Sequence, residues 1–330
     1  MLRQKIKDYK KIVAMNMAIR TAYKDDCKEF LRWQYNNPNI KTKDAYEAKI
    51  LRQAHVLEKG MSLKRPKNGF GVKKALELLE YITDYEGNGY LIEESQAVIN
   101  SIGVLNAYVD FHKKRGFLPV AVVDELRKYC KYIPVNEEEF GVIEADYENM
   151  RQLARGDFYD FFCSRHSVRQ FSEELVTEDE IKRAVSLAMH APSACNRQSV
   201  KVYFYRDEET NQKLGDLIAG NTGFEKDASK YIVLTSDISA FYEAFERNQM
   251  YVDGGIFALA LAEAFHYYGI ASCILQNGES AEKNMEFRKV CKNIPNNEKI
   301  ILFLAIGHYP KQFTYASSHR KKLQDVLAVK

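Results

Sequence analysis

The chain has 330 residues, of which 46% are hydrophobic and 28% are charged, an ordinary composition for a globular protein. Its formal net charge of +3 is too small to indicate nucleic acid or an acidic membrane as the main partner, so any electrostatic site must be local. The length favours two domains over one.

The sequence predicts no signal peptide, no membrane-spanning segment and no zinc site. The N-terminal stretch MLRQKIKDYKKIVAMNMAIR has no uninterrupted apolar core, which disfavours a signal peptide. The most apolar later segment, Ile256–Ala262, is far shorter than the roughly 20 residues of a membrane span. The six cysteines form no C-x-x-C pair, which disfavours a zinc site, so we predict no metal. Free thiols without an export signal predict a cytoplasmic protein.

Residues 1–150 are predicted to form a mainly helical N-terminal domain. Segments 25–37 and 43–60 mix polar and apolar residues without the alternation of a strand. The helix after Gly71 ends near Gly87 and has an apolar face made of Ala75, Leu78, Leu79 and Ile82. An acidic, weakly patterned segment, 134–158, marks the expected boundary with a second domain, 151–330.

The second domain alternates between helices and strands. Thr177 and Glu180 have the spacing of a capping box, which predicts a helix start, and a long apolar helix is expected to end at Gly269. Four short apolar runs predict strands: 199–205, 230–237, 270–275 and 299–307. This alternation is typical of an α/β or α+β layered fold.

Two polar clusters are the candidate functional residues of this domain. The first, in SRHSVRQFS, gathers Arg165, His166, Ser167 and Arg169, donors that suit a phosphate, although a solvated basic turn has the same composition. The second, in HAPSACNRQS, places Pro192, Ser193, Asn196 and Gln198 after a helix end. Such side chains suit the edge of a flat heteroaromatic ring, or an ordinary polar turn.

In this order the two clusters resemble the opening of the nitroreductase superfamily of FMN-dependent oxidoreductases. VDGGIFALALAEAFHYYGIASCILQNG resembles the central helix of that family and the loop after it, LFLAIGHYP a later strand, and SSHRKKLQDVL the C-terminal arginine segment. The resemblance covers about half of the chain, from Asp157 to Lys330. It implies an α+β fold, with a central sheet flanked by helices, after the helical N-terminal domain.

The resemblance also implies a homodimer with FMN bound at the subunit interface. Arg165 and Ser167, with His166 between them, would hold phosphate and ribityl oxygens, and Arg169 would lie at the pyrimidine edge of the flavin. Pro192, Ser193, Asn196 and Gln198 would line the flavin from the partner subunit. A backbone amide near Gln276 would point to flavin N5, within a segment made of Ile274, Leu275, Gln276, Asn277 and Gly278. Arg320 would reach the phosphate.

Two departures from the family pattern concern the phosphate contact and the substrate. Ser318 and His319 stand where many relatives carry a second basic residue before the C-terminal arginine, although Lys321 or Lys322 can substitute. The loop LQNG also differs from the versions expected in quinone or nitroaromatic reductases. Arg247, Asn248 and Gln249 fit either a substrate pocket or a polar surface.

The resemblance leaves the N-terminal half unexplained. Its most unusual stretch is His55–Gly71, in which His55, Glu58 and Lys59 share a helix face by spacing. The stretch resembles the leader of nitroreductase-like proteins of polysaccharide gene clusters, but we favour the simpler interpretation, a helix end with an ion pair followed by a glycine loop.

Three functions compete at this stage. The first is an oxidoreductase that passes hydride from NAD(P)H through FMN to a small-molecule acceptor by a ping-pong cycle. The second is an FMN enzyme with specialised chemistry, of the oxidase or reductive dehalogenase type. The third is a flavin-binding protein without catalysis. The first requires no catalytic acid or base from the protein, which fits the lack of a Ser-His-Asp set in the sequence.

Overall fold

The computed structural model describes residues 2–33, 39, 41–134, 140–194, 197–241, 244–277 and 281–330. The chain divides into two compact units. The sheet unit comprises Met1–Arg32 and Tyr147–Lys311, and the helical unit comprises Trp33–Asp146 and Gln312–Lys330. The division expected near residue 150 lies beside the crossing at Asp146, but each terminus belongs to the unit opposite to the one assigned from the sequence.

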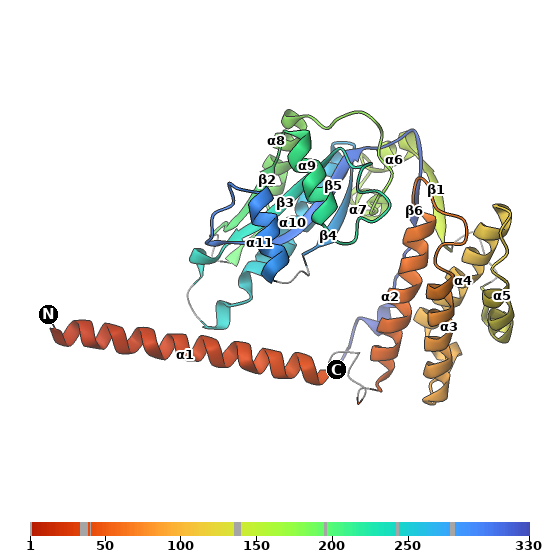
Figure 1. Ribbon diagram of the computed structural model, residues 1–330, viewed down its shortest axis with the longest axis horizontal. Helices are drawn as coiled ribbons and strands as arrows, with labels where there is room; N and C mark the ends of the chain where they lie inside the picture. The colour runs from red at the N-terminus through yellow and green to blue at the C-terminus, as the bar shows by residue number, and fades with distance from the viewer. Residues whose placement is uncertain are drawn as a thin grey trace. The chain divides into compact units, whose positions relative to one another are not determined.

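The helical unit is built from α2 (Lys43–Met61), α3 (Val72–Gly87), α4 (Gln96–Lys114) and α5 (Val120–Leu126), with short 3₁₀ turns at Ile92–Glu94 and Arg127–Tyr132 (Figure 1). Thr42 and Ser95 cap α2 and α4 by accepting hydrogen bonds from first-turn amides. The apolar face predicted for α3 is confirmed: Ala75, Leu78, Leu79 and Ile82 are all buried in the core of this unit.

A two-stranded antiparallel sheet ties the C-terminal segment to the helical unit. β1 (Val142–Asp146) pairs with β6 (Gln312–Ala316), so that Val142 faces Ala316 and Asp146 faces Gln312. Neither strand was predicted, because both are short and β1 is mostly half-buried, without the alternation that marks a strand. The residues after β6 therefore lie with the N-terminal helices.

The sheet unit contains the four predicted strands, which are confirmed. β2 (Val200–Phe204), β3 (Lys230–Asp237), β4 (Ile270–Gln276) and β5 (Glu298–His308) form a sheet of order β2-β3-β5-β4. All three pairings are antiparallel, for example Lys230 with Ile306 and Ile270 with His308. An antiparallel sheet with helices makes this an α+β fold, as the resemblance implied.

Helices cover both faces of this sheet (Figure 1). α8 (Glu178–Ala188) and α10 (Gln249–Tyr267) share one apolar core with the side chains of Ile232 and Leu304. On the other face, Phe287 of α11 (Ala281–Val290) packs on Phe303 at 4.7 Å between ring centroids. α9 (Glu208–Leu217) lies beside α11. The predicted capping box of Thr177 and Glu180 begins α8.

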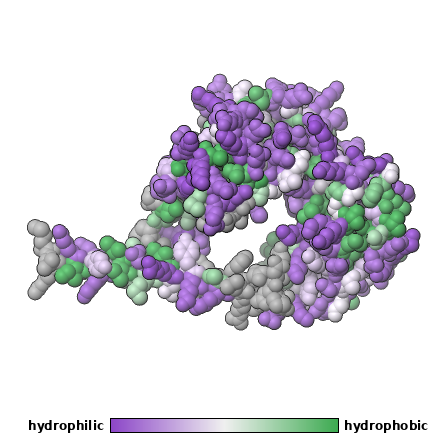
Figure 2. All heavy atoms as spheres, viewed as in Figure 1, coloured by the Kyte–Doolittle hydropathy of each residue, from purple (hydrophilic) through white to green (hydrophobic). Residues whose placement is uncertain are grey.

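Three further helices complete the sheet unit: α1 (Leu2–Trp33), α6 (Tyr147–Leu153) and α7 (Phe158–Ser164). α1 exposes several large apolar side chains between charged ones, and Figure 2 shows this mixture along the helix. They are Ile6, Tyr9, Ile12, Val13, Met17 and Tyr23. None of the helices in the described ranges has the length and apolar character needed to cross a membrane.

Glu298 is a buried charge at the start of β5. Its carboxylate accepts hydrogen bonds from Lys201 Nζ at 2.8 Å, Tyr203 OH at 2.9 Å and Thr235 Oγ1 at 2.6 Å. Burial alone would raise the pKa of Glu298, but these three partners hold it below its usual value. The network therefore stabilises the folded state at neutral pH, with the carboxylate charged.

Glu298→Ala should lower the free energy of unfolding by about 3 kcal/mol, because the buried Thr235 and the less buried Tyr203 and Lys201 all lose their acceptor. Urea titration at pH 7 measures this, with the exposed Glu209→Ala as a matched control expected to cost under about 0.5 kcal/mol. Since the folded pKa is depressed, the difference from the wild type should shrink as the pH falls below about 4. Equal stability of the two variants at pH 7 contradicts this role for Glu298.

Candidate functional site

The first candidate cluster, called here the basic loop (Arg165–Arg169), runs beside strand β4. It follows α7, whose first turn is capped by Asp157. Ser167 forms a parallel bridge with Ser272, and the Val168 amide donates to the Ser272 carbonyl at 3.1 Å. Because β4 is an edge strand of the sheet, its free side is available for this pairing. The backbone of the basic loop is thereby fixed.

Arg169 is the most buried charge of the basic loop. Arg169 is only 6% exposed, and its Nη1 donates a long hydrogen bond of 3.4 Å to the Ser167 carbonyl. Its Nε is buried, and the residues that the structure describes offer it no acceptor. A buried donor without an acceptor is costly, so a bound group with oxygen or nitrogen acceptors would complete the site.

Arg165 meets a buried carboxylate from α10. Its Nε lies 3.3 Å from Glu263 Oε1, an ion pair without hydrogen-bond geometry. Both oxygens of Glu263 and the Nε of Arg165 lack a hydrogen-bond partner within the described chain. Burial raises the pKa of Glu263, and the Arg165 charge opposes that rise. Arg165 is therefore held near its position but keeps donors for a ligand.

A buried hydrogen-bond chain supports the start of the basic loop. Ser164 Oγ lies 2.9 Å from His266 Nε2, and His266 Nδ1 lies 3.0 Å from Tyr309 OH. Burial, together with the positive charges of Arg165 and His166, lowers the pKa of His266 to about 4. A neutral imidazole both donates and accepts, so it can join the two hydroxyls.

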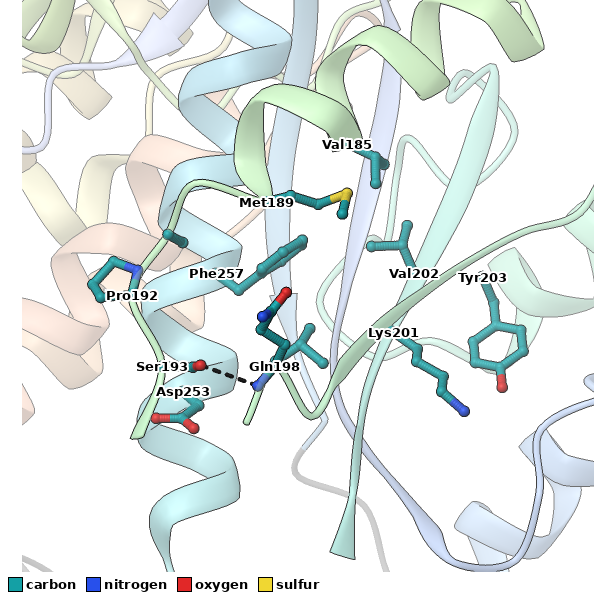
Figure 3. A pocket seen from close by; sticks show the side chains of 12 residues that line it. Val185, Met189, Pro192, Ser193, Gln198, Lys201, Val202, Tyr203, Asp253 and Phe257 are labelled. Atoms are coloured by element: carbon teal, nitrogen blue, oxygen red, sulfur yellow. Dashed lines mark hydrogen bonds between the residues drawn. The ribbon is translucent and has the colours of Figure 1, made fainter. Parts of the chain in front are cut away.

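The second cluster, called here the polar loop (Pro192–Gln198), is anchored at the other end of α10. The Ala194 amide donates to both carboxylate oxygens of Asp253, at 3.3 and 3.2 Å, and Gln249 Nε2 donates to Oδ1 at 2.8 Å. Ser193 Oγ accepts from the Gln198 amide at 3.1 Å (Figure 3). The predicted Asn196 lies outside the described residues.

The polar loop forms one wall of a cavity of about 400 Å³ between α8, α10 and β2. Figure 3 shows Phe257 of α10 and Met189, just after α8, directed into it, with Lys201 and Tyr203 of β2 on the opposite side. Most of the remaining lining is apolar. It includes Val185, Ala191, Val200 and Val202. The cavity therefore suits a mainly apolar molecule with a few polar contacts near Ser193 and Gln198.

The predicted ring-facing segment lies at the end of β4. Ile274 and Gln276 are exposed, whereas Leu275 is buried. Asn277 Nδ2 donates to the Ile300 carbonyl at 2.9 Å, so that side chain turns toward β5. Gly278 lies outside the described residues. Because Ser167 pairs with Ser272, two residues before Ile274, the structure brings the basic loop and this segment together.

The structure separates the basic loop from the polar loop within one chain. Their anchors on α10, Glu263 and Asp253, are ten residues apart. At 1.5 Å per residue, this separation is about 15 Å along the helix. Arg320 lies in the helical unit, where its Nη1 donates to the Ser318 carbonyl at 2.6 Å. The polar run at the start of α10 is partly accounted for, since Gln249 orients Asp253.

Three side chains of α10 that contact or support the two loops were not singled out from the sequence. Asp253, Glu263 and His266 were read only as parts of an apolar helix. A signal was available, because ionisable residues inside an apolar helix are rarely buried unless they are paired. Their partners, however, come from residues far away in sequence.

Comparison with known proteins identifies the region around both loops. Residues 163–236 match the model of the nitroreductase family. A curated relative, the CLA biosynthesis enone reductase of Lactiplantibacillus plantarum, is 30% identical over 112 residues. The match covers 33% of this chain and spans about half, 52%, of that relative.

Two solved structures match about half of this chain at low identity. The nitroreductase family protein of Streptococcus pneumoniae is 21% identical, with a TM-score of 0.44, over 53% of this chain and 100% of that one. A protein described as a nitroreductase in complex with FMN, from Desulfovibrio desulfuricans, is 19% identical, with a TM-score of 0.46. It covers 53% of this chain and 97% of its own.

The buried imidazole makes stability depend on pH. The folded pKa of His266, about 4, lies below its ordinary value of 6.5, so the unfolded chain takes up a proton first as the pH falls. Stability should therefore drop by about 2 kcal/mol between pH 7.5 and pH 5. Urea titrations of His266→Gln should lack this part of the pH dependence, whereas the exposed His190→Gln should retain it. If the stability of His266→Gln changes with pH as steeply as that of the wild type, His266 is not the source of this pH dependence.

Proposed function

We propose that the protein is an FMN-dependent oxidoreductase that takes hydride from NAD(P)H and passes electrons to a small acceptor in a ping-pong cycle. The single observation that carries this is Arg169, a buried arginine whose Nε has no acceptor in the described chain, within the residues that match the nitroreductase family model. FMN carries phosphate, ribityl and ring oxygens that suit such donors. When bound, FMN would supply the redox chemistry itself.

The residues of the basic loop divide the work of binding. Arg165 and Ser167, with His166 between them, are the candidates for the phosphate and ribityl oxygens, and the pairing of Ser167 with Ser272, which fixes the loop, supports this. Arg169, further along the same loop, is the candidate for the pyrimidine edge, where its charge would favour the reduced form. Ile274–Gln276 lie beside this loop and are the candidates for one face of the ring.

We propose that two copies of the chain complete each flavin site. The basic and polar loops are anchored at opposite ends of α10, which supports a site that takes one loop from each copy. α10 also exposes an apolar stripe at helical spacing, formed by Val252, Ile256 and Leu259. A self-complementary helix face of this kind suits a two-fold interface.

The acceptor that we propose is a conjugated carbonyl compound. The matched curated relative is described as an enone reductase, and the cavity beside the polar loop has a mostly apolar lining with a polar edge. Anaerobic assays with NADH or NADPH and a set of α,β-unsaturated ketones test this. Reduction of a nitroaromatic or a quinone without any turnover of enones would reject a conjugated carbonyl compound as the acceptor.

Purified protein should be yellow and should release FMN, not FAD, on denaturation. The donor set suits one terminal phosphate, and no G-x-G-x-x-G sequence for a dinucleotide is present. Chromatography of the released flavin and bleaching of the 450 nm band under anaerobic NADPH measure this. FAD, or no flavin after reconstitution, rejects the proposed function; bound FMN that NADPH and NADH fail to reduce favours a specialised enzyme or a binding protein.

Arg169→Gln should lower the flavin midpoint potential by several tens of millivolts, since 30 mV in a two-electron couple corresponds to about 1.4 kcal/mol. FMN affinity should fall less. Arg320→Gln tests the phosphate role that the resemblance predicts for Arg320, with weaker FMN binding and an unchanged potential expected. The exposed Arg206→Gln is the control for both. If Arg169→Gln and Arg320→Gln shift the flavin potential equally, Arg169 does not lie at the flavin ring.

Leu259→Glu should convert the dimer to a monomer and lower FMN occupancy at least tenfold, because a charge in an apolar interface is costly. Light scattering and the ratio of absorbance at 450 and 280 nm measure both effects. Leu187→Glu, on the similarly exposed surface of α8, is the matched control and should stay dimeric. A wild-type chain that is monomeric with full flavin occupancy contradicts the two-copy site.

A further inference from the structure

The helical unit contains a small polar cavity that the proposed flavin chemistry does not use. It lies between α2, α4 and the residues after β6, and its volume is about 170 Å³. At about 30 Å³ for each water, it holds roughly six waters. This cavity, called here the α2–α4 notch, takes in His55 and Glu58 from the unusual stretch His55–Gly71.

Glu58 places a carboxylate in the wall of the notch. The residue is 4% exposed, and its Oε1 accepts from Ser317 Oγ at 2.8 Å and from the Ser318 amide at 3.3 Å. The other oxygen, Oε2, lies 3.5 Å from Nδ1 of the half-exposed His55. A carboxylate buried to this degree needs a close positive partner. Oε2 is thus the acceptor that a cationic ligand would find in the notch.

Arg320 places the opposite charge at the rim of the same notch. Its guanidinium donates from Nη1 to the Ser318 carbonyl, and no described carboxylate lies within ion-pairing distance of it. An arginine has five N–H donors in a planar fork, which matches a carboxylate. Arg320 therefore has donors left for an anionic group.

Ser318 fixes the spacing between the two charges. Its amide donates to the Glu58 carboxylate, and its carbonyl accepts from the Arg320 guanidinium. Covalent geometry therefore keeps the two charged groups within about 10 Å of each other. Ser318 also has a φ of +45°, a left-handed conformation that residues other than glycine rarely adopt. Backbone strain of this kind tends to occur at binding sites.

The lining selects one ligand chemistry. An α-amino acid carries an ammonium and a carboxylate that, with one hydrogen bond of about 2.9 Å at each end, span a similar distance. Leu51, Ala54 and Val104 add an apolar wall for a short side chain. A simple anion would face the Glu58 charge. No three His, Cys, Asp or Glu side chains in the described chain are arranged to hold a metal ion.

We propose that the α2–α4 notch binds a small aliphatic α-amino acid, with its ammonium on Glu58 and its carboxylate on Arg320. The ligand bridges α2 and the segment after β6. It therefore stabilises the packing of the C-terminal segment on the helical unit, and the chain unfolds at a higher temperature when the ligand is present. This site is independent of the flavin proposal except for Arg320, whose predicted phosphate role competes with it.

The test uses the full-length chain, saturated with any flavin that it binds. Calorimetric titration and thermal melts should show binding of L-valine, with at least tenfold weaker binding of isobutylamine and of isobutyrate, which each lack one charge. Equal binding of valine and isobutyrate, or no binding of valine, leucine or alanine at 10 mM, overturns the proposal.

Glu58→Gln isolates the charge, because the amide oxygen can still accept from Ser317 and Ser318. Valine affinity should fall at least tenfold while the melting temperature without ligand stays close to that of the wild type. The matched control is Glu125→Gln, an exposed change in the same unit that should bind valine normally. Unchanged valine affinity in Glu58→Gln overturns the proposal.

Arg320→Gln covers the case in which Glu58→Gln does not fold, because Arg320 is exposed. It should bind valine at least tenfold more weakly and isobutylamine unchanged. Competition of inorganic phosphate and of FMN with valine distinguishes the two proposed roles of Arg320. If both displace valine, or if phosphate binds as well as valine does, the notch belongs to a phosphate site and the amino-acid proposal fails. In Arg320→Gln, weaker valine binding with unchanged flavin binding rejects only the flavin role of Arg320. Weaker flavin binding with unchanged valine binding overturns the amino-acid proposal.

Discussion

The cost of burying charge on α10 organises the sheet unit. Asp253 and Glu263 lie in a helix whose other buried side chains, His266 apart, are apolar, so each carboxylate needs partners from elsewhere. Asp253 finds backbone and amide donors in the polar loop and in Gln249, and Glu263 finds Arg165. One helix thereby positions both candidate loops, and its length sets the distance between them.

The partners at the two ends are not equally complete. Asp253 accepts three hydrogen bonds, whereas Glu263 has an ion pair but no hydrogen bond from the described residues. The unsatisfied donors of Arg165 and Arg169 lie at this same end. Electrostatic strain is thus concentrated beside the edge strand β4, where a ligand rich in acceptors gains most. The neutral His266 below it avoids adding a third positive charge.

The pairing of β1 with β6 has a different consequence. It places the residues after Ala316 in the helical unit, where Glu58 accepts from Ser317 and Ser318. The C-terminal segment, which the sequence assigns to the flavin, is therefore organised by a buried carboxylate of α2. An ion pair between Lys321 and Glu47, at 3.7 Å, also joins this segment to the same helix. The helical unit therefore also holds the C-terminal segment, through contacts with α2.

Local patterns in the sequence determined the main elements. The four strands, the apolar face of α3, the capping box at Thr177 and the end of α10 at Gly269 follow from periodicity and from the backbone preferences of single residues, and all four are confirmed. The resemblance also located the basic loop, because its motif is contiguous. Such features depend on neighbours within a few residues, which the sequence displays directly.

Tertiary structure decided the rest. The ion pair of Arg165 with Glu263, the pairing of Ser167 with Ser272 and the return of residues 312–316 to β1 each join positions about 100 or more residues apart. No local pattern encodes such contacts, because they depend on strand order and on which buried charges can reach a partner. The sequence therefore determined which groups are available for chemistry, and only the folded chain decided which of them lie close enough to act together.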